Sequence, residues 1–392
     1  MKTEIDPQVA FRHKSDKQLK KERFLFKSMN SSFLVWLFSK TAGLLLSGIS
    51  PFKGLIRKTI FRQFCAGETL EDSKKVVADL KSKGVGAILD YSKEGKGTVA
   101  DFEDTVKNIK EVVTLANKER AIPYASVKLT GVMDSAILER MNEGKNTDDQ
   151  TKAEYEKAML RLDDLFAYCH KLKVPIYIDA EETWIQNTID RISEYFMEKY
   201  NREEAIVNTT VQMYRWDRLE YLKNLIKESD AKGYFAGIKI VRGAYMEKEN
   251  ERAGKNNVKS PVSEIKAHVD LDFNEAVSHC LHHLDRVRIC VGTHNEASTI
   301  ALINQMEELG ISKSDSRIYF SQLFGMSDHI TYDLAAQGYN VTKYVPFGPL
   351  KSALPYLVRR AQENTSIAGQ TNRELDLIRS EMERRKQQKL LR

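Results

Sequence analysis

Three runs decide the fold: YASVKLTG (124–131), VPIYIDAEE (174–182) and AIVNTTVQMY (205–214). Each run is short and rich in Val, Ile and Tyr, which is typical of a strand that is buried on both faces. Residues 151–172 between the first two repeat apolar side chains with the 3.6-residue period of a helix. Strands of this kind alternating with helices predict a parallel sheet that is covered by helices.

The same alternation extends in both directions. Thr69 and Asp72 resemble a capping box and predict a helix that ends near Gly84, and Thr151 predicts the start of the helix over 151–172. Eight strands, each followed by a helix, predict an α/β fold of the (βα)8 barrel type, with a doubly wound sheet as the alternative. The other five predicted strands are 85–91, 234–245, 286–295, 317–325 and 341–348.

The two ends of the chain differ from this alternating part. Residues 1–23 are polar, and we predict little fixed structure there. The apolar run FLVWLFSKTAGLLLSGISPF (33–52) is interrupted by Lys40 and Pro51, so we predict buried accessory helices, with an interfacial helix and a membrane span as alternatives. The predicted segments are an N-terminal extension with accessory helices (1–68), the barrel (69–369), and a charged C-terminal helix or tail (370–392).

The composition excludes several classes of protein. The 392 residues are 42% apolar and 30% charged, which excludes a disordered or collagen-like chain. The net charge of +6 suits anionic ligands or an anionic membrane surface and is too small for a nucleic-acid footprint. The four cysteines show no metal-binding spacing, so we predict free thiols and no metal site.

In a barrel of this kind, functional residues lie where the strands meet the loops that follow them. Cations are frequent at these positions and predict that the barrel mouth binds a carboxylate or phosphate. The charged and polar residues concerned are Asp90, Lys128, Asp179, Glu181, Glu182, Gln212, Lys239, Arg242, His294, Asn295, Gln322, Lys343 and Tyr344, with Arg359, Arg360 and Glu363 on the last helix.

Other interpretations of individual features stay open at this point. GKGTVA (95–100) fits a dinucleotide-binding pattern, although an ordinary glycine-rich loop explains it as well. Lys128 could form a Schiff base in a barrel lyase. Arg359 and Glu363 have the i, i+4 spacing of a surface ion pair. A barrel that binds anions without catalysis is a further alternative.

Several separate motifs occur in an order that resembles the proline dehydrogenase family, flavin enzymes that oxidise L-proline to Δ1-pyrroline-5-carboxylate. The resemblance covers roughly residues 30–370 and is closer to the monofunctional, eukaryote-like branch than to the long bifunctional bacterial proteins. The motifs are FCAGET (64–69), SVKLTG (126–131), IDAEE (178–182), VRGAYMEKE (241–249), GTHN (292–295), QLFGMSD (322–328) and YVPFGPLKSALPYLVRRAQEN (344–364).

The resemblance implies a distorted barrel whose last helix lies over the barrel mouth and brings two arginines inward. With Lys128 they would hold the proline carboxylate, while two tyrosines and a leucine would pack around the ring. Asp179 would hydrogen-bond Tyr344, and Glu94 matches a family glutamate that gates the site. The implied substrate residues are Lys128, Tyr245, Leu323, Tyr344, Arg359 and Arg360, and the catalytic set is Lys128, Asp179, Tyr344, Arg359 and Arg360.

The resemblance also implies FAD, bound without a covalent bond across the strand ends. Gln212 would contact the edge of the isoalloxazine, and Lys239 would lie near N5, where many bacterial members carry arginine. A lysine there is a point donor and not a fork. The implied cofactor residues are Gln212, Lys239, Arg242, Gly243, Thr293, His294, Asn295 and Glu363.

The function implied is transfer of a hydride from C5 of proline to flavin N5. No strong base is evident for the substrate nitrogen, so we expect activity to rise with pH. In the family a membrane quinone reoxidises the flavin, so residues 24–64 and the basic tail would act as peripheral anchors on the cytoplasmic face of a bacterial inner membrane, or on the mitochondrial inner membrane. A pyrroline-5-carboxylate dehydrogenase is an expected downstream partner. Hydroxyproline oxidation is the alternative activity.

Overall fold

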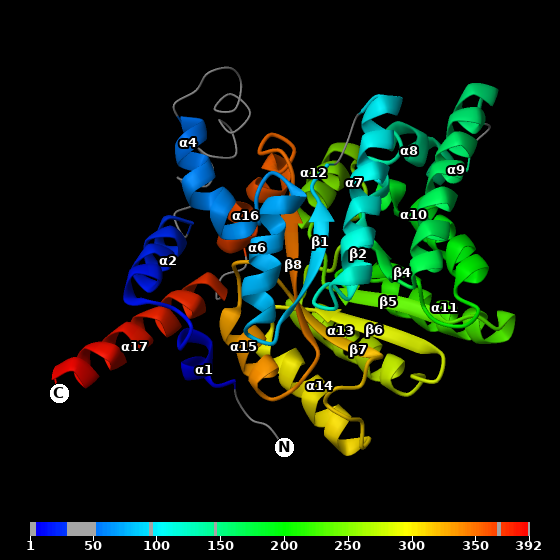
Figure 1. The fold of residues 1–392 in the computed structure, drawn as a ribbon. Coiled ribbons are helices and arrows are strands. Elements are labelled where there is room, and N and C mark those ends of the chain that lie inside the picture. Colours follow the sequence, from blue (N-terminus) through cyan, green and yellow to red (C-terminus); the bar gives the residue numbers. More distant parts are fainter. Residues whose placement is uncertain (1–4, 30–51, 94–96, 145–146, 367–369, 391–392) are drawn as a thin grey trace.

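The computed structural model describes residues 5–29, 52–93, 97–144, 147–366 and 370–390, without the side chains at 362–372. Within them, eight strands form a closed barrel in sequential order, and every neighbouring pair is parallel (Figure 1). The predicted (βα)8 barrel is therefore confirmed, and the doubly wound sheet that a GKGTVA dinucleotide site requires is excluded. The strands are β1 (Gly86–Tyr91), β2 (Tyr124–Val127), β3 (Ile176–Ile178), β4 (Val207–Gln212), β5 (Ala236–Val241), β6 (Val287–Gly292), β7 (Ile318–Leu323) and β8 (Val341–Phe347).

Helices surround the barrel (Figure 1). The predicted capping box of Thr69 and Asp72 is present, whereas the helix predicted from Thr151 begins earlier, because Asp148 accepts the Thr151 N–H at 2.7 Å and is the N-cap. The helices after the strands are α7 (Val99–Lys118), η2 (Leu129–Gly131), α8 (Ser135–Glu143), α9 (Asp149–Leu172), α10 (Thr183–Tyr200), α11 (Arg218–Lys232), α12 (Met246–Asn256), α13 (Lys266–Leu281), α14 (Glu296–Glu308), α15 (Asp328–Ala336) and α16 (Leu354–Ser366), and α6 (Leu70–Lys81) precedes β1.

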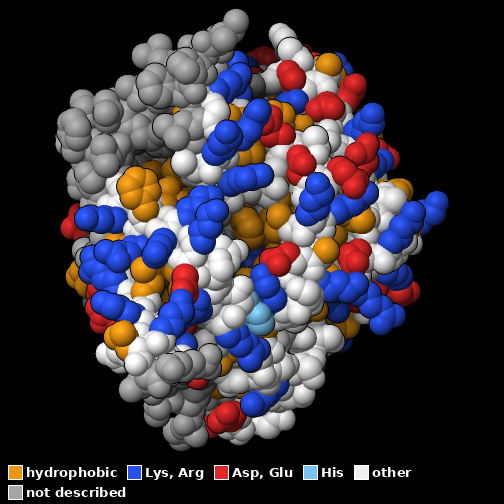
Figure 2. Space-filling view, turned by 60° about the vertical axis from the view of Figure 1, so that its left-hand side comes forward, with side chains coloured by type: hydrophobic (Ala, Val, Ile, Leu, Met, Phe, Trp, Pro, Cys, Tyr) orange, Lys and Arg blue, Asp and Glu red, His pale blue; other side chains and the backbone are white. Residues whose placement is uncertain are grey.

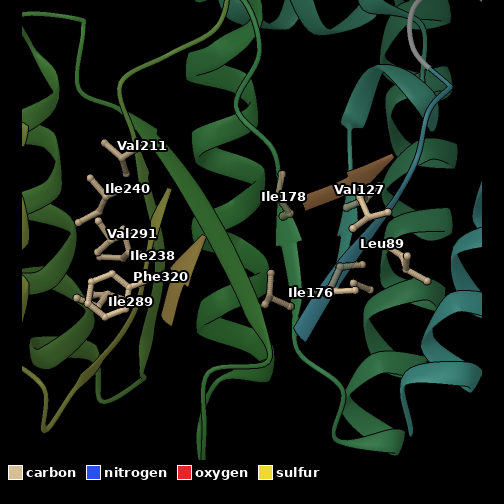
Figure 3. Close-up of a cluster of buried hydrophobic side chains, with 14 of the residues drawn as sticks. Leu89, Val127, Ile176, Ile178, Val211, Ile238, Ile240, Ile289, Val291 and Phe320 are labelled. Atoms are coloured by element: carbon tan, nitrogen blue, oxygen red, sulfur yellow. The ribbon is translucent and has the colours of Figure 1, made fainter. Parts of the chain in front are cut away.

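Successive residues of each strand point to opposite faces of the barrel wall, which creates two separate cores. The outer core fills the space between strands and helices, and Figure 3 shows its aliphatic side chains, among them Ile176, Ile238 and Ile289. The inner core closes the barrel and contains a stacked pair of tyrosines, Tyr124 and Tyr177, with ring centres 4.5 Å apart. Lys128 and Asp179 lie above this aromatic layer, at the carboxyl ends of β2 and β3.

The terminal segments fold onto the barrel, contrary to the prediction of little fixed structure in residues 1–23. Helices α1 (Pro7–Phe11) and α2 (Asp16–Met29) lie beside α17 (Gln370–Leu390) (Figure 1). They bury Phe11 and Leu19, while α17 buries Leu375 and Ile378. The apolar side chains are too sparse among the lysines to give a clear period, which explains why the sequence pattern missed them.

A second small core connects the N-terminal accessory helices to the helix over the mouth. It contains Phe61 and Phe64 from η1 (Arg57–Phe61) and α5 (Arg62–Phe64), which follow α4 (Phe52–Ile56), together with Leu357 of α16. Most of the apolar run over 33–52 lies outside the described residues. Among those described, no helix is both long and apolar enough to cross a membrane. The predicted segment boundaries stay predictions.

Candidate active site

A buried ionic network lies inside the barrel mouth. Lys128 follows β2, and its Nζ is 2.9 Å from Asp90 Oδ2 at the end of β1 and 2.9 Å from Asp179 Oδ2 just after β3. The same ammonium donates to the hydroxyl of Tyr344 on β8 at 3.1 Å. Four residues on four different strands or strand ends are thus held together by the closed barrel.

Asp179 is the centre of this network. Its Oδ1 accepts from Nζ of Lys239 on β5 at 2.5 Å, and its Oδ2 accepts from the hydroxyl of Tyr344 at 2.5 Å. All the charged members are less than a tenth exposed, so their attraction is weakly screened by water. Two lysines face two aspartates, Asp90 and Asp179, and the formal charge of this buried network is balanced.

The network fixes the protonation states of its members. Burial alone would raise the pKa of Asp179, but the charges of Lys239 and Lys128 and the hydrogen bonds from Lys239 and Tyr344 outweigh it and lower the pKa. Burial and the neighbouring carboxylates of Asp179 and Asp90 raise the pKa of Tyr344 well above its usual value. Asp179 is therefore a carboxylate and Tyr344 a neutral phenol at neutral pH, and neither is suited to removing a proton from a substrate.

Helix α16 supplies two adjacent buried arginines to the mouth. The Arg359 guanidinium lies 5.1 Å from the ring centre of Tyr245, which follows β5, and Arg360 lies 5.1 Å from the ring of Tyr356 in its own helix. Both arginines are less than a tenth exposed, which excludes an exposed surface ion pair for Arg359. Leu323 on β7 is in register with Tyr344, so these two side chains emerge side by side.

The implied cofactor residues occupy the ends of β4, β5 and β6. Gln212 ends β4 and donates from Nε2 to the Glu181 carbonyl at 2.7 Å. Arg242 follows β5 and donates to Thr293 Oγ1 at 2.8 Å and to Ser298 Oγ at 2.9 Å. Its Nε donates to Asp270 at 2.9 Å. Arg242 therefore connects the loop after β5 with the loop after β6 and with helices α13 and α14.

Gly243 gives the backbone an unusually close approach beside these residues. Its φ of +133° is in the region that favours glycine, and a Cβ there would lie 2.4 Å from the Tyr214 ring. The loop after β5 can adopt this path only with glycine. The backbone next to Arg242 is thereby packed directly against the Tyr214 ring.

The GTHN motif forms the loop between β6 and α14. Asn295 is the N-cap of α14, and its side chain accepts the N–H of Ser298 at 3.2 Å. His294 Nδ1 lies 2.8 Å from Ser327 Oγ. Burial, followed by the positive charges of Lys343, Arg360, His329 and Arg242, lowers the pKa of His294 to about 3, so the imidazole is neutral.

One of the polar residues predicted at the mouth, Lys343, is placed elsewhere by the structure, and two others are outside the part of the chain that it describes. Lys343 faces away from the barrel interior, where its Nζ lies 2.8 Å from Asp328 Oδ1 in α15, so it does not contribute to the mouth. Strand alternation explains this, because Tyr344 next to it points inward. Glu94 and the side chain of Glu363 lie outside the described residues.

Sequence reasoning missed some functional neighbours. Asp90 was among the strand-end residues, but its pairing with Lys128 was not predicted, although two opposite charges at adjacent strand ends were a usable signal. Glu181 accepts from the Thr130 hydroxyl at 2.5 Å and fixes the loop after β2. The contact of Ser327, in the QLFGMSD motif, with Glu374 in α17 gave no sequence signal, because the two residues are 47 positions apart.

The residues present fit a flavin dinucleotide. The mouth combines a neutral histidine with lysine, arginine and glutamine donors along three neighbouring strand ends. Such a donor set suits the anionic and hydrogen-bonding parts of a dinucleotide. Gln212 and Lys239 lie on the barrel side of Arg242, which separates the donors for a flavin ring from those for a phosphate.

Comparison with known proteins supports this assignment. The family model for proline dehydrogenase matches residues 73–373. The chain is 32% identical over 322 residues to the carbapenem antibiotics biosynthesis protein CarD of Pectobacterium carotovorum, covering 82% of this chain and 83% of that protein. It is 31% identical over 405 residues to mitochondrial proline dehydrogenase 1 of Dictyostelium discoideum, covering 92% of this chain and 70% of that protein.

A solved structure agrees at the level of the fold. Proline utilization A from Bdellovibrio bacteriovorus superposes with a TM-score of 0.77 at 20% identity, and the match covers 92% of this chain and 41% of that longer chain. The family model, the relatives and the barrel together confirm the resemblance read from the motifs, and the chain belongs to the proline dehydrogenase family.

Proposed function

We propose that this chain oxidises L-proline to Δ1-pyrroline-5-carboxylate, with the substrate carboxylate held by Lys128, Arg359 and Arg360. The observation that carries the proposal is the buried network of Lys128, Asp179 and Tyr344 on the barrel wall, together with two buried arginines on the helix over the mouth. Arg359 and Arg360 would add two cations from α16 to Lys128, and charged hydrogen bonds from several cations favour the binding of one carboxylate.

The remaining substrate residues would position the pyrrolidine ring. Tyr344 is held by hydrogen bonds with both Asp179 and Lys128, and Leu323 lies next to it in register. Tyr245 is buried beneath the Arg359 guanidinium. These three side chains provide an apolar surface of fixed shape beside the carboxylate site, which limits the orientations of a bound ring.

FAD, bound without a covalent link, would supply the acceptor for the hydride from C5. Gln212 and Lys239 would hold its ring system, and Arg242, Thr293, His294 and Asn295 would hold the phosphate and adenosine part, with Gly243 proposed beside them from its place in the motif. Glu363 is proposed as a further contact from its sequence position. Lys239 is already bound to Asp179, so its ammonium has a fixed direction.

The protonation states of Asp179 and Tyr344 imply that the substrate nitrogen loses its proton before the reaction. Two lysines lower the pKa of Asp179, and Tyr344 stays protonated, so neither group accepts that proton. We expect kcat/KM for proline to rise with pH until the substrate amine has titrated, because only the neutral nitrogen can donate its lone pair. A profile that is flat between pH 6 and 9 would require a base that this site lacks among its described residues.

A Schiff-base lyase is disfavoured by the same network. Two carboxylates at 2.9 Å stabilise the ammonium form of Lys128, and an ammonium is not a nucleophile.

Anaerobic addition of L-proline to the purified holoenzyme should bleach the flavin absorbance, whereas borohydride with a carbonyl substrate should trap no adduct at Lys128. Retention of the oxidised flavin spectrum with proline would overturn the proposed oxidation.

We also propose that a membrane quinone accepts the electrons and that the chain binds peripherally to the membrane. The face that carries α2 and α17 in Figure 1 comes forward in Figure 2, and Lys and Arg side chains are spread over much of it. Phe24 of α2 is 72% exposed on this helix. An apolar side chain among cations suits the interface of an anionic bilayer. The exposed basic residues of α2 are Lys17, Lys20, Lys21, Arg23 and Lys27.

Vesicle binding tests this attachment. The full chain should sediment with anionic phosphatidylglycerol vesicles and less with neutral ones. Replacing Lys20 and Lys21 by glutamate should weaken binding by about thirtyfold or more, because each basic residue near an anionic surface contributes about 1 kcal/mol. The matched control replaces Lys152 and Lys157, which are exposed on α9, and should bind as the unchanged chain does.

The product would pass to a pyrroline-5-carboxylate dehydrogenase.

A further inference from the structure

A continuous set of contacts links the C-terminal helix α17 to the histidine of the GTHN motif. The backbone N–H of Ser327 donates to Oε1 of Glu374 in α17. The side chain of the same serine lies 2.8 Å, Oγ to Nδ1, from His294. Ser327 is 5% exposed, so both contacts are shielded from water. One residue therefore connects a helix outside the barrel with a side chain at its mouth.

Ser327 is held in a conformation that a non-glycine residue seldom adopts. Its φ of +50° and ψ of +43° are left-handed, a conformation that is unfavourable for a residue with a Cβ. Neighbouring contacts keep the loop in this shape. Gln63 donates to the Gly325 carbonyl at 3.0 Å, and Lys343 donates to the Met326 carbonyl. The position of the Ser327 hydroxyl is thus determined by groups on three other elements.

The contact matters because the neutral imidazole of His294 carries a proton on only one of its nitrogens. The hydroxyl of Ser327 has one proton, and among the described residues no other acceptor lies within hydrogen-bond distance of it. When the serine donates to Nδ1, the proton of His294 is on Nε2, and Nε2 becomes a hydrogen-bond donor. A donor is the group that a phosphate or ribose oxygen requires.

We propose that Ser327, held by Glu374 of α17, is a positioning residue that fixes the ring orientation and the Nε2–H tautomer of His294 for the anionic part of the cofactor. This inference rests on the proposed contact between His294 and FAD. The C-terminal helix then acts on cofactor retention through Ser327, although it does not itself line the barrel.

The test compares variants that break this link with variants that disturb α17 elsewhere. Ser327→Gly removes the hydroxyl and suits the positive φ, while Glu374→Leu removes the acceptor at similar size. Glu374→Gln retains an oxygen that can accept the Ser327 N–H and is the rescue control. Arg385→Gln breaks the contacts of α17 with Asp16 and with the Phe11 carbonyl, which are remote from Ser327 in the chain.

Two measurements are made on the full chain. Nitrogen-15 spectra of labelled imidazoles, with His294 identified by its loss in His294→Ala, report the tautomer, and FAD fluorescence titration reports the Kd. We expect Ser327→Gly to give mixed tautomers and a Kd about tenfold higher, equal to about 1.4 kcal/mol. Glu374→Leu should raise the Kd severalfold. Glu374→Gln should match the unchanged chain, and Arg385→Gln should lower only the Tm.

The outcomes separate this inference from the proposed function. A single Nε2–H tautomer in Ser327→Gly with unchanged Kd overturns the positioning role. A rise in Kd for Arg385→Gln as large as that for Glu374→Leu also overturns it, because general loosening of α17 would then be sufficient. An unchanged Kd in His294→Ala removes the cofactor contact of His294, while a tautomer change in Ser327→Gly would still support the link from Ser327 to the imidazole.

Discussion

Strand β8 separates a buried inner ionic cluster from a partly buried outer one, and the two clusters differ in charge balance. The inner cluster, reached by Tyr344, pairs Lys128 and Lys239 with Asp90 and Asp179. The outer cluster, reached by the adjacent Lys343, lies between the barrel and the terminal helices. Its members are the cations Lys14 and Lys343 and the carboxyl groups of Glu22, Asp328 and Glu374.

The difference in balance changes the behaviour of the carboxyl groups. In the inner cluster, two lysines hold the pKa of Asp179 down. In the outer cluster two lysines face three carboxyl groups, and burial raises the pKa of Glu374 to about 7 despite the charge of His329. The balanced inner cluster presents charged groups to a ligand site. The outer cluster has an excess of carboxyl groups, and Glu374 holds a proton there near neutral pH.

Asp179→Asn breaks the balance of the inner cluster and has the largest expected effect. The variant leaves two buried lysines with one carboxylate, and loss of one partner of a buried pair costs about 3–5 kcal/mol. We expect kcat/KM to fall by at least about a hundredfold and the Tm to drop, because Tyr344 also loses an acceptor. Near-normal kinetics would show that the inner cluster does not organise the active site.

Arg359→Met and Arg360→Met test whether the two arginines of α16 act on the substrate beside the inner cluster. Each variant removes one cation from the mouth, at a cost on the order of 2–5 kcal/mol in substrate binding. The KM for proline should rise by about thirtyfold or more, since about 1.4 kcal/mol corresponds to a factor of ten, while the visible flavin spectrum stays. Normal proline saturation in both variants contradicts the carboxylate assignment.

Glu374→Gln tests the outer cluster through the pH dependence of stability. The raised pKa means that folded Glu374 binds a proton more tightly than the unfolded chain does. The contribution of Glu374 to the stability of the folded state is complete below its unfolded pKa of about 4.5, and it is lost as the pH rises through about 7. Between pH 5 and 8 the free energy of unfolding of the unchanged chain should therefore fall by on the order of 2 kcal/mol relative to that of the Gln variant.

Urea unfolding at both pH values measures this difference. The control is Glu103→Gln, because Glu103 is exposed and should show no such relative change. Equal pH dependence in the unchanged chain and in Glu374→Gln would mean that the outer cluster does not hold a proton on Glu374.

The inner cluster was largely predictable from sequence, and the outer cluster was not. Strand ends of a barrel converge, so Lys128, Asp179 and Tyr344 could be placed together from strand positions alone. Alternation within β8 also predicts that Lys343 points outward, whereas its charge and its position near a strand end suggested a place in the mouth. Glu374 and Lys14 meet only because sparse apolar residues dock α17 and α2, and such contacts between distant segments leave no local periodicity.

The smallest expected effect is a change in substrate preference in Tyr344→Ser, which tests whether the inner cluster selects its ligand as well as holding it. The Tyr344 phenol is fixed by Asp179 and Lys128, so an added hydroxyl on C4 of the ring would meet a phenol that cannot move aside. An unpaired polar group costs about 1–3 kcal/mol, which predicts that the unchanged enzyme prefers proline to trans-4-hydroxyproline. Serine is smaller and offers a polar partner. The ratio of kcat/KM for the two substrates should therefore shift towards hydroxyproline by about tenfold, with flavin still bound. If the serine variant loses both substrates equally, Tyr344 is a packing residue of the inner core and does not determine specificity.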